Sequence, residues 1–225
     1  FGYGLSAPIA QLAFDEYQPD LLVTVDNGIA SFEGVERAKA LGMKVIVTDH
    51  HLAASPNPED LPKADAIVNP NQPECAFPSK AACGCAVIFY VLCAVRRAVL
   101  DQSILPESHV PNMAQYLDLV ALATVADVVP LDKNNQILVE QGLRRIRKGH
   151  ARPGIQALLN VSKKTPERLT SKDFGFALGP RLNAAGRMDD MSVGIECLLA
   201  KDLTRAEHIA QTLDELNQDR KAVEA

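Results

Sequence analysis

Two short apolar runs with a helical segment between them constrain the fold of this 225-residue chain more than any other feature. Residues 20–25 and 43–48 are continuous and rich in valine, which is typical of parallel strands buried on both faces. Between them, residues 31–41 carry apolar side chains at helical spacing, and Gly42 follows as a stop. A strand, a helix and a second strand in this order form a right-handed unit, so the sequence predicts a parallel sheet.

The segments on either side of this unit are mostly helical in pattern. Residues 5–17 predict a helix that Ser6 caps, and residues 64–68 predict a third strand. Further helices are expected at 84–100, 113–126, 134–148, 154–161 and 203–225. The expected fold class is therefore α/β, a parallel sheet flanked by helices with a helical second half and a long C-terminal helix. We expect one domain over residues 1–202 and a connector helix over 203–225, leading to a second domain.

Composition places the chain among soluble globular proteins. Hydrophobic residues make up 47% and charged residues 23%, and the net charge is −5. A negative total argues against non-specific binding of nucleic acid as a polycation, but it allows a local basic groove. No apolar run reaches the roughly 20 residues of a membrane span, and no leader peptide is visible. The five cysteines form no C-x-x-C pair, so we expect buried free thiols and a cytoplasmic protein rather than a zinc site.

Polar side chains with metal-binding chemistry follow directly after the predicted strands. Asp26 follows the first strand, and Asp49, His50 and His51 follow the second. Because the carboxyl ends of parallel strands meet at one edge of a sheet, these groups are expected to lie together. Asp127 closes an apolar helix, where a carboxylate is costly to bury without a partner or a cation.

Each of these residues also has a plainer interpretation. Asp26 could belong to a turn with the following Asn and Gly, and Asp127 could brace a neighbouring loop. Two adjacent histidines beside an aspartate at a strand end are harder to explain by packing alone. The three other histidines are interpreted as surface residues: His109, His150 and His208.

Carboxylates and imidazoles without a thiolate favour Mn²⁺ or Mg²⁺ over Zn²⁺. Two such ions about 4 Å apart stabilise both the attacking and the leaving oxygen of a phosphoryl transfer. Three aspartates and one ligating histidine underfill two ions, so the residues predict an incomplete site.

The ordered motifs resemble those of the DHH phosphoesterases. Val-Thr-Val-Asp-Asn-Gly, Val-Thr-Asp-His-His and Ala-Thr-Val-Ala-Asp-Val-Val-Pro look like the second, third and fourth motifs of that family. Two further segments narrow the resemblance to its bacterial branch of single-strand-specific exonucleases: Ile67-Val-Asn-Pro-Asn71 and Gly179-Pro-Arg-Leu-Asn-Ala-Ala-Gly-Arg187. The resemblance runs over essentially the whole chain.

The resemblance implies a role for each residue of the predicted site. Asp26 would bridge two Mn²⁺ or Mg²⁺ ions, and His50 and Asp127 would complete the shell of the second ion. His51 would lie beside the scissile phosphate, and Asp49 would orient a histidine. The implied reaction is 5′-to-3′ hydrolysis of single-stranded DNA to 5′-mononucleotides in recombination and repair. A monomer that works with a helicase or a single-strand-binding protein is expected.

The chain also departs from the family pattern. The first motif, an Asp-x-Asp pair, would lie upstream of Phe1, and the second domain would follow Ala225. We therefore expect little or no activity from these 225 residues alone. Two alternatives stay open: a DHH phosphodiesterase for small substrates, such as a nanoRNase or a cyclic-dinucleotide enzyme, and a non-catalytic replication scaffold.

Three residues are candidates for binding the substrate phosphates: Arg181, Asn183 and Arg187. Arginine presents a planar fork to phosphate oxygens, and asparagine can bond the backbone or a base. The alternative for Arg181 is a structural ion pair, for example with Asp189 or Asp190. The basic run over residues 144–152 is interpreted as a solvated surface, with a nucleic-acid track as the alternative.

Overall fold

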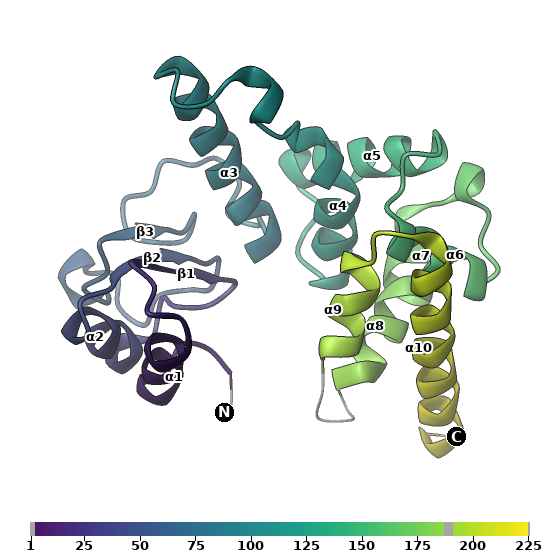
Figure 1. Cartoon of the computed structure of the whole chain (residues 1–225), viewed down its shortest axis with the longest axis horizontal. Helices are drawn as coiled ribbons and strands as arrows, with labels where there is room; N and C mark the ends of the chain where they lie inside the picture. The colour runs from purple at the N-terminus through teal and green to yellow at the C-terminus, as the bar shows by residue number, and fades with distance from the viewer. Residues whose placement is uncertain (1–2, 187–190, 225) are drawn as a thin grey trace. The chain divides into compact units, whose positions relative to one another are not determined.

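The computed structural model describes residues 3–186 and 191–224 and divides into two compact units. The α/β unit comprises Phe1–Met113 and Val129–Asn135, and the helical unit comprises Ala114–Val128 and Gln136–Ala225. Figure 1 shows the three strands in the first unit and helices alone in the second.

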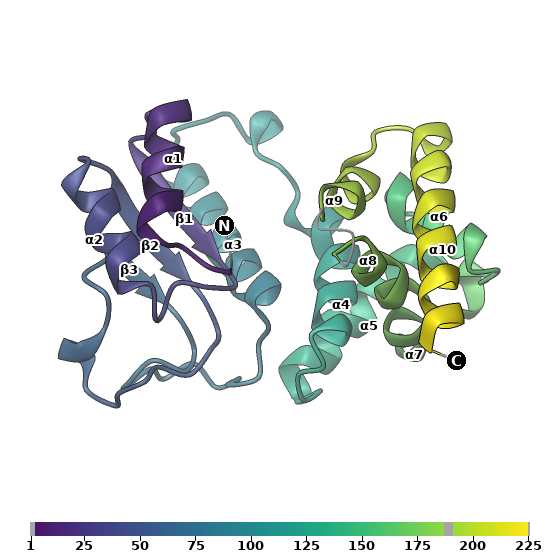
Figure 2. The same ribbon diagram turned by 90° about the horizontal axis from the view of Figure 1, so that it is seen from below.

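The α/β unit contains a three-stranded parallel sheet in the order β1-β2-β3. Its strands are β1 (Leu21–Val25), β2 (Lys44–Thr48) and β3 (Ala66–Val68). Helices α1 (Ala7–Tyr17) and α2 (Phe32–Ala40) cover one face, and α3 (Gly84–Asp101) lies on the other (Figures 1 and 2). Short 3₁₀ turns occur at Pro58–Asp60 and Glu107–His109. The predicted parallel sheet and its strand–helix–strand unit are confirmed.

Local sequence signals explain where these elements begin and end. The Ser6 side chain accepts a hydrogen bond from Ile9 N at the start of α1, as its position predicts. Gly42 has a φ of +88° and turns the chain from α2 into β2. The unit's core consists of small and medium side chains: Leu5, Ala10, Val35, Ala38, Met43, Val45 and Val47.

The sequence predicted that β1 and β2 are buried on both faces, and this is wrong for β1. Val45 and Val47 of β2 are fully buried, whereas Leu21, Val23 and Val25 of β1 are 43–46% exposed. These three residues alternate along the strand, so they share one face of the sheet, and this face is incompletely covered at the edge that β1 forms in the described sheet.

The helical unit is built from short helices around one apolar core. Its helices are α4 (Leu117–Ala126), α5 (Lys133–Arg147, which begins in the α/β unit), α6 (Pro153–Val161), α7 (Ser171–Asp173), α8 (Gly179–Ala185), α9 (Ser192–Leu199) and α10 (Leu203–Glu224). A π-helix spans Phe174–Leu178, and 3₁₀ turns span Met113–Tyr116 and Pro166–Arg168. The helices expected from the sequence are present within a few residues.

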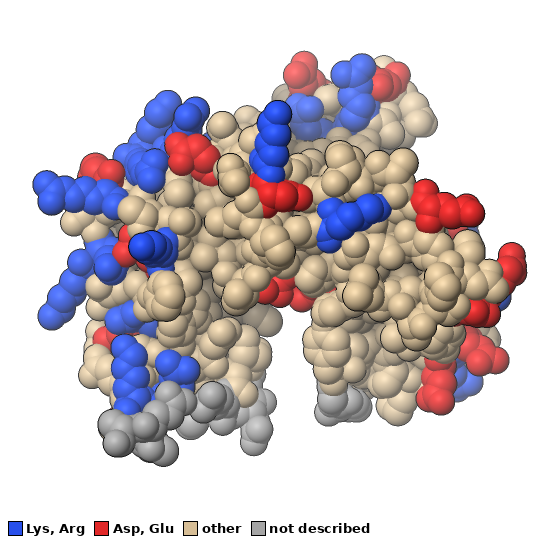
Figure 3. Space-filling model, turned by 180° about the vertical axis from the view of Figure 1, so that it is seen from behind, with Lys and Arg blue, Asp and Glu red and all other residues tan. Residues whose placement is uncertain are grey.

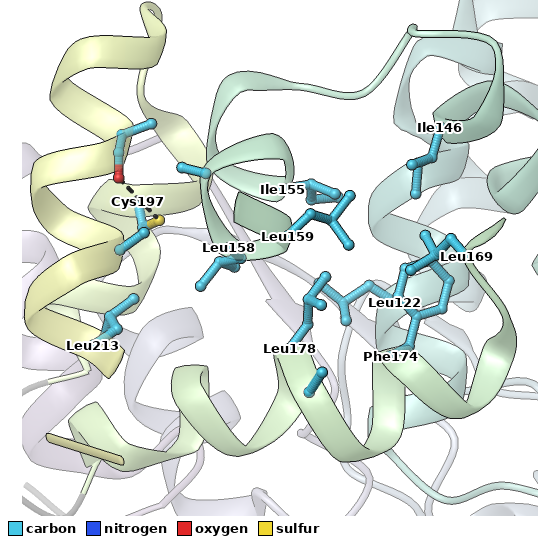
Figure 4. Close-up of a cluster of buried hydrophobic side chains, with 14 of the residues drawn as sticks. Leu122, Ile146, Ile155, Leu158, Leu159, Leu169, Phe174, Leu178, Cys197 and Leu213 are labelled. Carbon is cyan, nitrogen blue, oxygen red and sulfur yellow. Dashed lines mark hydrogen bonds between the residues drawn. The ribbon is translucent and has the colours of Figure 1, made fainter. Parts of the chain in front are cut away.

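Large side chains fill the core of the helical unit (Figure 4). Phe174, Leu158 and Leu178 are fully buried there. The Cys197 thiol is buried with them, 4.0 Å from the Ala206 carbonyl oxygen, and burial raises its pKa to about 11. A thiol with that pKa stays protonated and unreactive at neutral pH.

Helix α10 is part of this core. Ala206, Ile209, Ala210 and Leu213 on one face of α10 are buried, and the helix packs on α6, α8 and α9. The predicted boundary at residue 202, between a DHH domain and a connector helix, stays a prediction.

All five cysteines are thiols outside any disulfide, as expected. Two of them are buried and three are half-buried, so the expectation of buried thiols holds only in part. Among the described residues, no helix is both long and apolar enough to span a membrane.

Candidate metal centre

Three of the predicted site residues place their ligand atoms in one small volume. One carboxylate or imidazole atom from each of Asp26, His50 and His51 lies within 4.8 Å of the others. Asp26 Oδ1 and His50 Nε2 are 3.1 Å apart, and the ring centroids of the two histidines are 4.5 Å apart. The structure therefore brings together side chains that follow β1 and β2, as the parallel sheet predicts.

The backbone around Asp26 is held in an uncommon conformation. Asp26 has a φ of +64°, in the left-handed region, and its N–H donates to the Thr48 carbonyl of β2 at 3.0 Å. The Tyr3 hydroxyl donates to the Asp26 carbonyl oxygen, and its ring lies edge-on to His51. Together these contacts turn the Asp26 side chain toward the histidines.

The donor set of this site fits a divalent cation. Asp26 Oδ1 and His50 Nε2 are both removed from solvent, and they face each other at 3.1 Å without forming a hydrogen bond of good geometry. A buried carboxylate oxygen of this kind is costly unless a cation or donor meets it. One carboxylate and two imidazoles without a thiolate suit Mn²⁺ or Mg²⁺, and the geometry alone does not separate His50 from His51 as a ligand.

Asp49 is buried at the centre of a hydrogen-bond network. Its carboxylate accepts the N–H groups of Ile29 (2.9 Å), His50 (2.7 Å) and His51 (3.2 Å), and Oδ1 lies 2.7 Å from His51 Nδ1. Burial alone would raise the pKa of Asp49, but these bonds outweigh it and hold that pKa below its ordinary value. With Nδ1–H bound to Asp49, His51 presents Nε2 as its basic nitrogen. The role of Asp49 in orienting a histidine stays a prediction, and the contact that it needs is present.

Gly84 allows the start of α3 to approach Asp26. A Cβ atom on Gly84 would lie 2.3 Å from Asp26 Oδ1, closer than any side chain permits. The helix thus directs the positive end of its dipole toward that carboxylate. Sequence reasoning missed this residue, because a glycine at a helix start gives no sign of what it packs against.

Two asparagines support the histidine backbone. Asn71 Nδ2 donates to the His50 carbonyl oxygen at 2.6 Å, and Asn69 Nδ2 donates to the His51 carbonyl oxygen at 2.9 Å. Sequence reasoning used both residues only as part of a motif. The one available signal was their place directly after the third strand, at the same edge of the sheet as the histidines.

Asp127 lies in the helical unit, where it ends α4 as the C-cap residue with an exposed side chain. The following Val128 has a φ of +59°, which is rare for a β-branched residue. The meeting of Asp127 with the other ligands stays a prediction.

The candidate phosphate-binding residues fall on or beyond α8. The Arg181 guanidinium is half-buried against Asp214, with Nε 2.7 Å from Oδ1, and Nη1 donates to the Ala177 carbonyl. This is the structural ion pair that the sequence left open, with a different partner from those considered. Asn183 is exposed, and Arg187 lies outside the described residues.

Three of the six basic residues in the run over 144–152 form ion pairs within the helical unit. Arg144 and Arg147 pair with Glu140, and Arg152 pairs with Asp118, which is 1% exposed. Figure 3 shows Lys and Arg side chains interspersed with Asp and Glu, with more of the former on the helical unit at left. A structural and solvated role explains the run without a ligand.

The family assignment follows from comparison with known proteins. The model of the DHH family, N-terminal domain, matches residues 4–124. That match covers more than half of the chain and includes β1, β2 and the ligand cluster. The chain belongs to the DHH family.

Its relatives include exonucleases named RecJ. The chain is 54% identical over its full length to the single-stranded-DNA-specific exonuclease RecJ of Haemophilus influenzae and 53% identical to that of Escherichia coli. It spans 38% of the length of each of these relatives. A solved exonuclease RecJ bound to manganese matches all of this chain and 52% of its own, with a TM-score of 0.84 and 28% identity. RecJ of Thermus thermophilus in complex with Mn²⁺ matches 97% of this chain and 30% of its own, with a TM-score of 0.79 and 29% identity.

Proposed function

We propose that this chain forms the metal-binding core of a single-stranded-DNA-specific exonuclease. The observation that carries the proposal is the cluster of Asp26, His50 and His51 at the carboxyl ends of β1 and β2. Support also comes from the high identity to exonucleases of that specificity over the whole chain. The reaction would be 5′-to-3′ hydrolysis of DNA to 5′-mononucleotides in recombination and repair.

In this reaction, the residues of the cluster would bind the metal, neutralise charge on the phosphate and orient a histidine. Asp26 and His50 would hold Mn²⁺ or Mg²⁺ together with Asp127, and the ions would supply charge stabilisation at the phosphorus. His51 would lie beside the scissile phosphate, where Nε2 neutralises developing charge or protonates the leaving oxygen. Asp49 would keep His51 in the tautomer that this requires.

We further propose that the parent protein completes the site from outside these 225 residues. The chain spans 38% of its curated relatives, and the cluster holds too few ligands for two ions. The exposed edge strand β1 offers backbone groups and an apolar face to a further strand that carries the missing aspartates. The isolated chain is therefore expected to show little nuclease activity.

The cellular setting belongs to the same proposal. Single-stranded DNA would be the macromolecular substrate, and a helicase or a single-strand-binding protein would supply it to a monomeric enzyme in the cytoplasm. Five cysteines outside any disulfide are compatible with a reducing compartment.

The sharpest test compares substrates with the parent protein that contains this chain. We expect Mn²⁺-dependent release of mononucleotides from a 5′-phosphorylated single strand, and little release from duplex DNA or dinucleotides. Asp20→Asn is the control for variants of Asp26. Asp20 is exposed and lies just before the other end of β1, so this variant should cut DNA as the unmodified protein does. Cleavage of dinucleotides alone would reject the exonuclease in favour of a small-substrate phosphodiesterase, and no cleavage of any substrate would favour a scaffold.

Substrate contacts by Arg181, Asn183 and Arg187 are also proposals. Because Arg181 is already paired with Asp214, we expect Arg187→Ala to change DNA binding more than Arg181→Ala. A lost phosphate contact lowers the dependence of log affinity on log salt by about one. Binding of labelled single strands over a salt series measures this, and an unchanged slope for Arg187→Ala would remove that residue from the interface.

A further inference from the structure

Side chains bond all four backbone polar groups of the histidine pair. The Asp49 carboxylate accepts the N–H groups of His50 (2.7 Å) and His51 (3.2 Å). On the carbonyl side, Asn71 bonds His50 (2.6 Å) and Asn69 bonds His51 (2.9 Å). The backbone of both histidines is therefore satisfied on the donor and the acceptor side without help from water.

The two asparagines are themselves held in place. Asn69 is 1% exposed, and its Oδ1 accepts the N–H of Asn71 at 2.7 Å, so both ends of its amide are used. Asn71 also donates to the Lys80 carbonyl at 3.1 Å, and the Lys80 ammonium donates to the carbonyls of Pro70 and Cys75. The Lys80 bonds therefore hold the loop after β3 in shape, and the two asparagine amides join that loop to the loop after β2.

We propose that Asn69 and Asn71 are positioning residues that set the directions of the His51 and His50 imidazoles. The N–H bonds to Asp49 and the carbonyl bonds to the asparagines fix the peptide planes on both sides of each histidine Cα. The Cα–Cβ direction follows from those planes. From that fixed starting point, the His51 ring reaches Asp49 Oδ1 through Nδ1 at 2.7 Å, and the His50 ring lies with Nε2 3.1 Å from Asp26 Oδ1. The consequence for cation binding rests on the proposed function, whereas the effect on the rings does not.

Gln72 provides a matched control in the same loop. Its side-chain amide donates to the Ile67 carbonyl at 3.2 Å, so it makes the same kind of bond without touching a histidine. Replacing Gln72 by alanine should loosen the loop as much as either asparagine variant, while leaving the carbonyls of His50 and His51 bonded.

The experiment follows the imidazole nitrogen signals of the full chain by ¹⁵N–¹H correlation spectroscopy without metal. The chain has five histidines, so His109, His150 and His208 act as internal references. We expect Asn71→Ala to shift or broaden the His50 ring signals and Asn69→Ala those of His51, with the three references unchanged. Unchanged ring signals in both variants, or equal changes in Gln72→Ala, would overturn the proposal.

A second variant and a second measurement guard against misfolding. Asn71→Asp keeps the side-chain shape but replaces the donating amide by an oxygen, and it should change the His50 signals as Asn71→Ala does.

Titration of the parent protein with Mn²⁺ is the second measurement. The asparagine variants should bind Mn²⁺ with an affinity reduced about tenfold or more, and Gln72→Ala should bind it with the affinity of the unmodified protein. Equal affinities for all variants would overturn the positioning of a cation site. A failure of the unmodified parent protein to bind Mn²⁺ would instead count against the proposed function, while the ring signals still decide the proposal.

Discussion

The two units of this protein use their interiors differently. In the helical unit, the interior is filled by large apolar side chains such as Phe174, Leu158 and Leu178. In the α/β unit, the buried apolar residues are mostly alanine and valine. Both units bury polar side chains, but the buried Asp49 and Asn69 of the α/β unit bond the histidine loop, whereas Asp118 of the helical unit pairs with Arg152. The comparison indicates that stability comes mainly from the helical unit, whereas the α/β unit holds an ordered polar site on a smaller core.

The largest expected effect tests the chemistry of the α/β unit. In the parent protein, Asp26→Ala should lower the rate of DNA hydrolysis by about a thousandfold or more, because metal charge stabilisation supplies several kcal/mol of the barrier reduction. The thermal unfolding midpoint should fall only slightly, since the Asp26 side chain is half-exposed and lies outside the apolar core, and the main cost is placing alanine at a φ of +64°. Steady-state rates and melting curves measure both, and unchanged activity would reject the bridging role.

The converse variant tests the core of the helical unit. Phe174→Ala should lower the free energy of unfolding by about 3–5 kcal/mol, because it removes a fully buried ring and leaves a cavity. The Mn²⁺ affinity of the folded fraction should stay the same, since no predicted ligand lies in that core. Urea unfolding and a Mn²⁺ titration provide the two readouts. A large loss of affinity with little loss of stability would contradict the division of roles.

A third variant tests the contact between α3 and Asp26. Gly84→Ala should weaken Mn²⁺ binding by about tenfold, because the new methyl group displaces the Asp26 carboxylate. Gly175→Ala is the control, since its Cβ would meet only Val125 Cγ1 at 3.4 Å. Isothermal titration calorimetry with Mn²⁺ compares the affinities of the two variants. Equal affinities would show that displacing the Asp26 carboxylate does not weaken metal binding.

The smallest expected effect concerns the start of α7. Burial raises the pKa of Asp173, but bonds from Lys164 and Thr170 outweigh it and hold the pKa below its ordinary value. A lowered folded-state pKa adds stability above the ordinary pKa, and this is lost as pH falls through the folded value. Asp173→Asn should therefore cost about 1 kcal/mol at neutral pH and less in acid. Urea midpoints at both pH values measure this, and a pH-independent difference would contradict it.

Much of the α/β unit could be predicted from the sequence because its signals are local. Continuous valine-rich runs, a capping Ser6 and the stop at Gly42 indicated the strands and helices within a few residues. The clustering of Asp26 with the histidines followed from strand order alone.

The features that sequence reasoning missed depend on contacts between distant segments. The approach of Gly84 to Asp26 and the π-helix at Phe174–Leu178 have no local signature. The exposure of β1 could not be foreseen either, because a valine-rich strand has the same pattern at an edge as in the middle of a sheet. The pairing of Arg181 with Asp214 joins residues 33 positions apart.

The most direct test is anomalous diffraction at the manganese absorption edge from crystals of the parent protein grown with Mn²⁺. We expect an anomalous peak within bonding distance of the Asp26 carboxylate and the His50 imidazole, with Asp127 as a further ligand. Peaks elsewhere, or no peak beside Asp26, would contradict a metal-dependent nuclease centre in this chain.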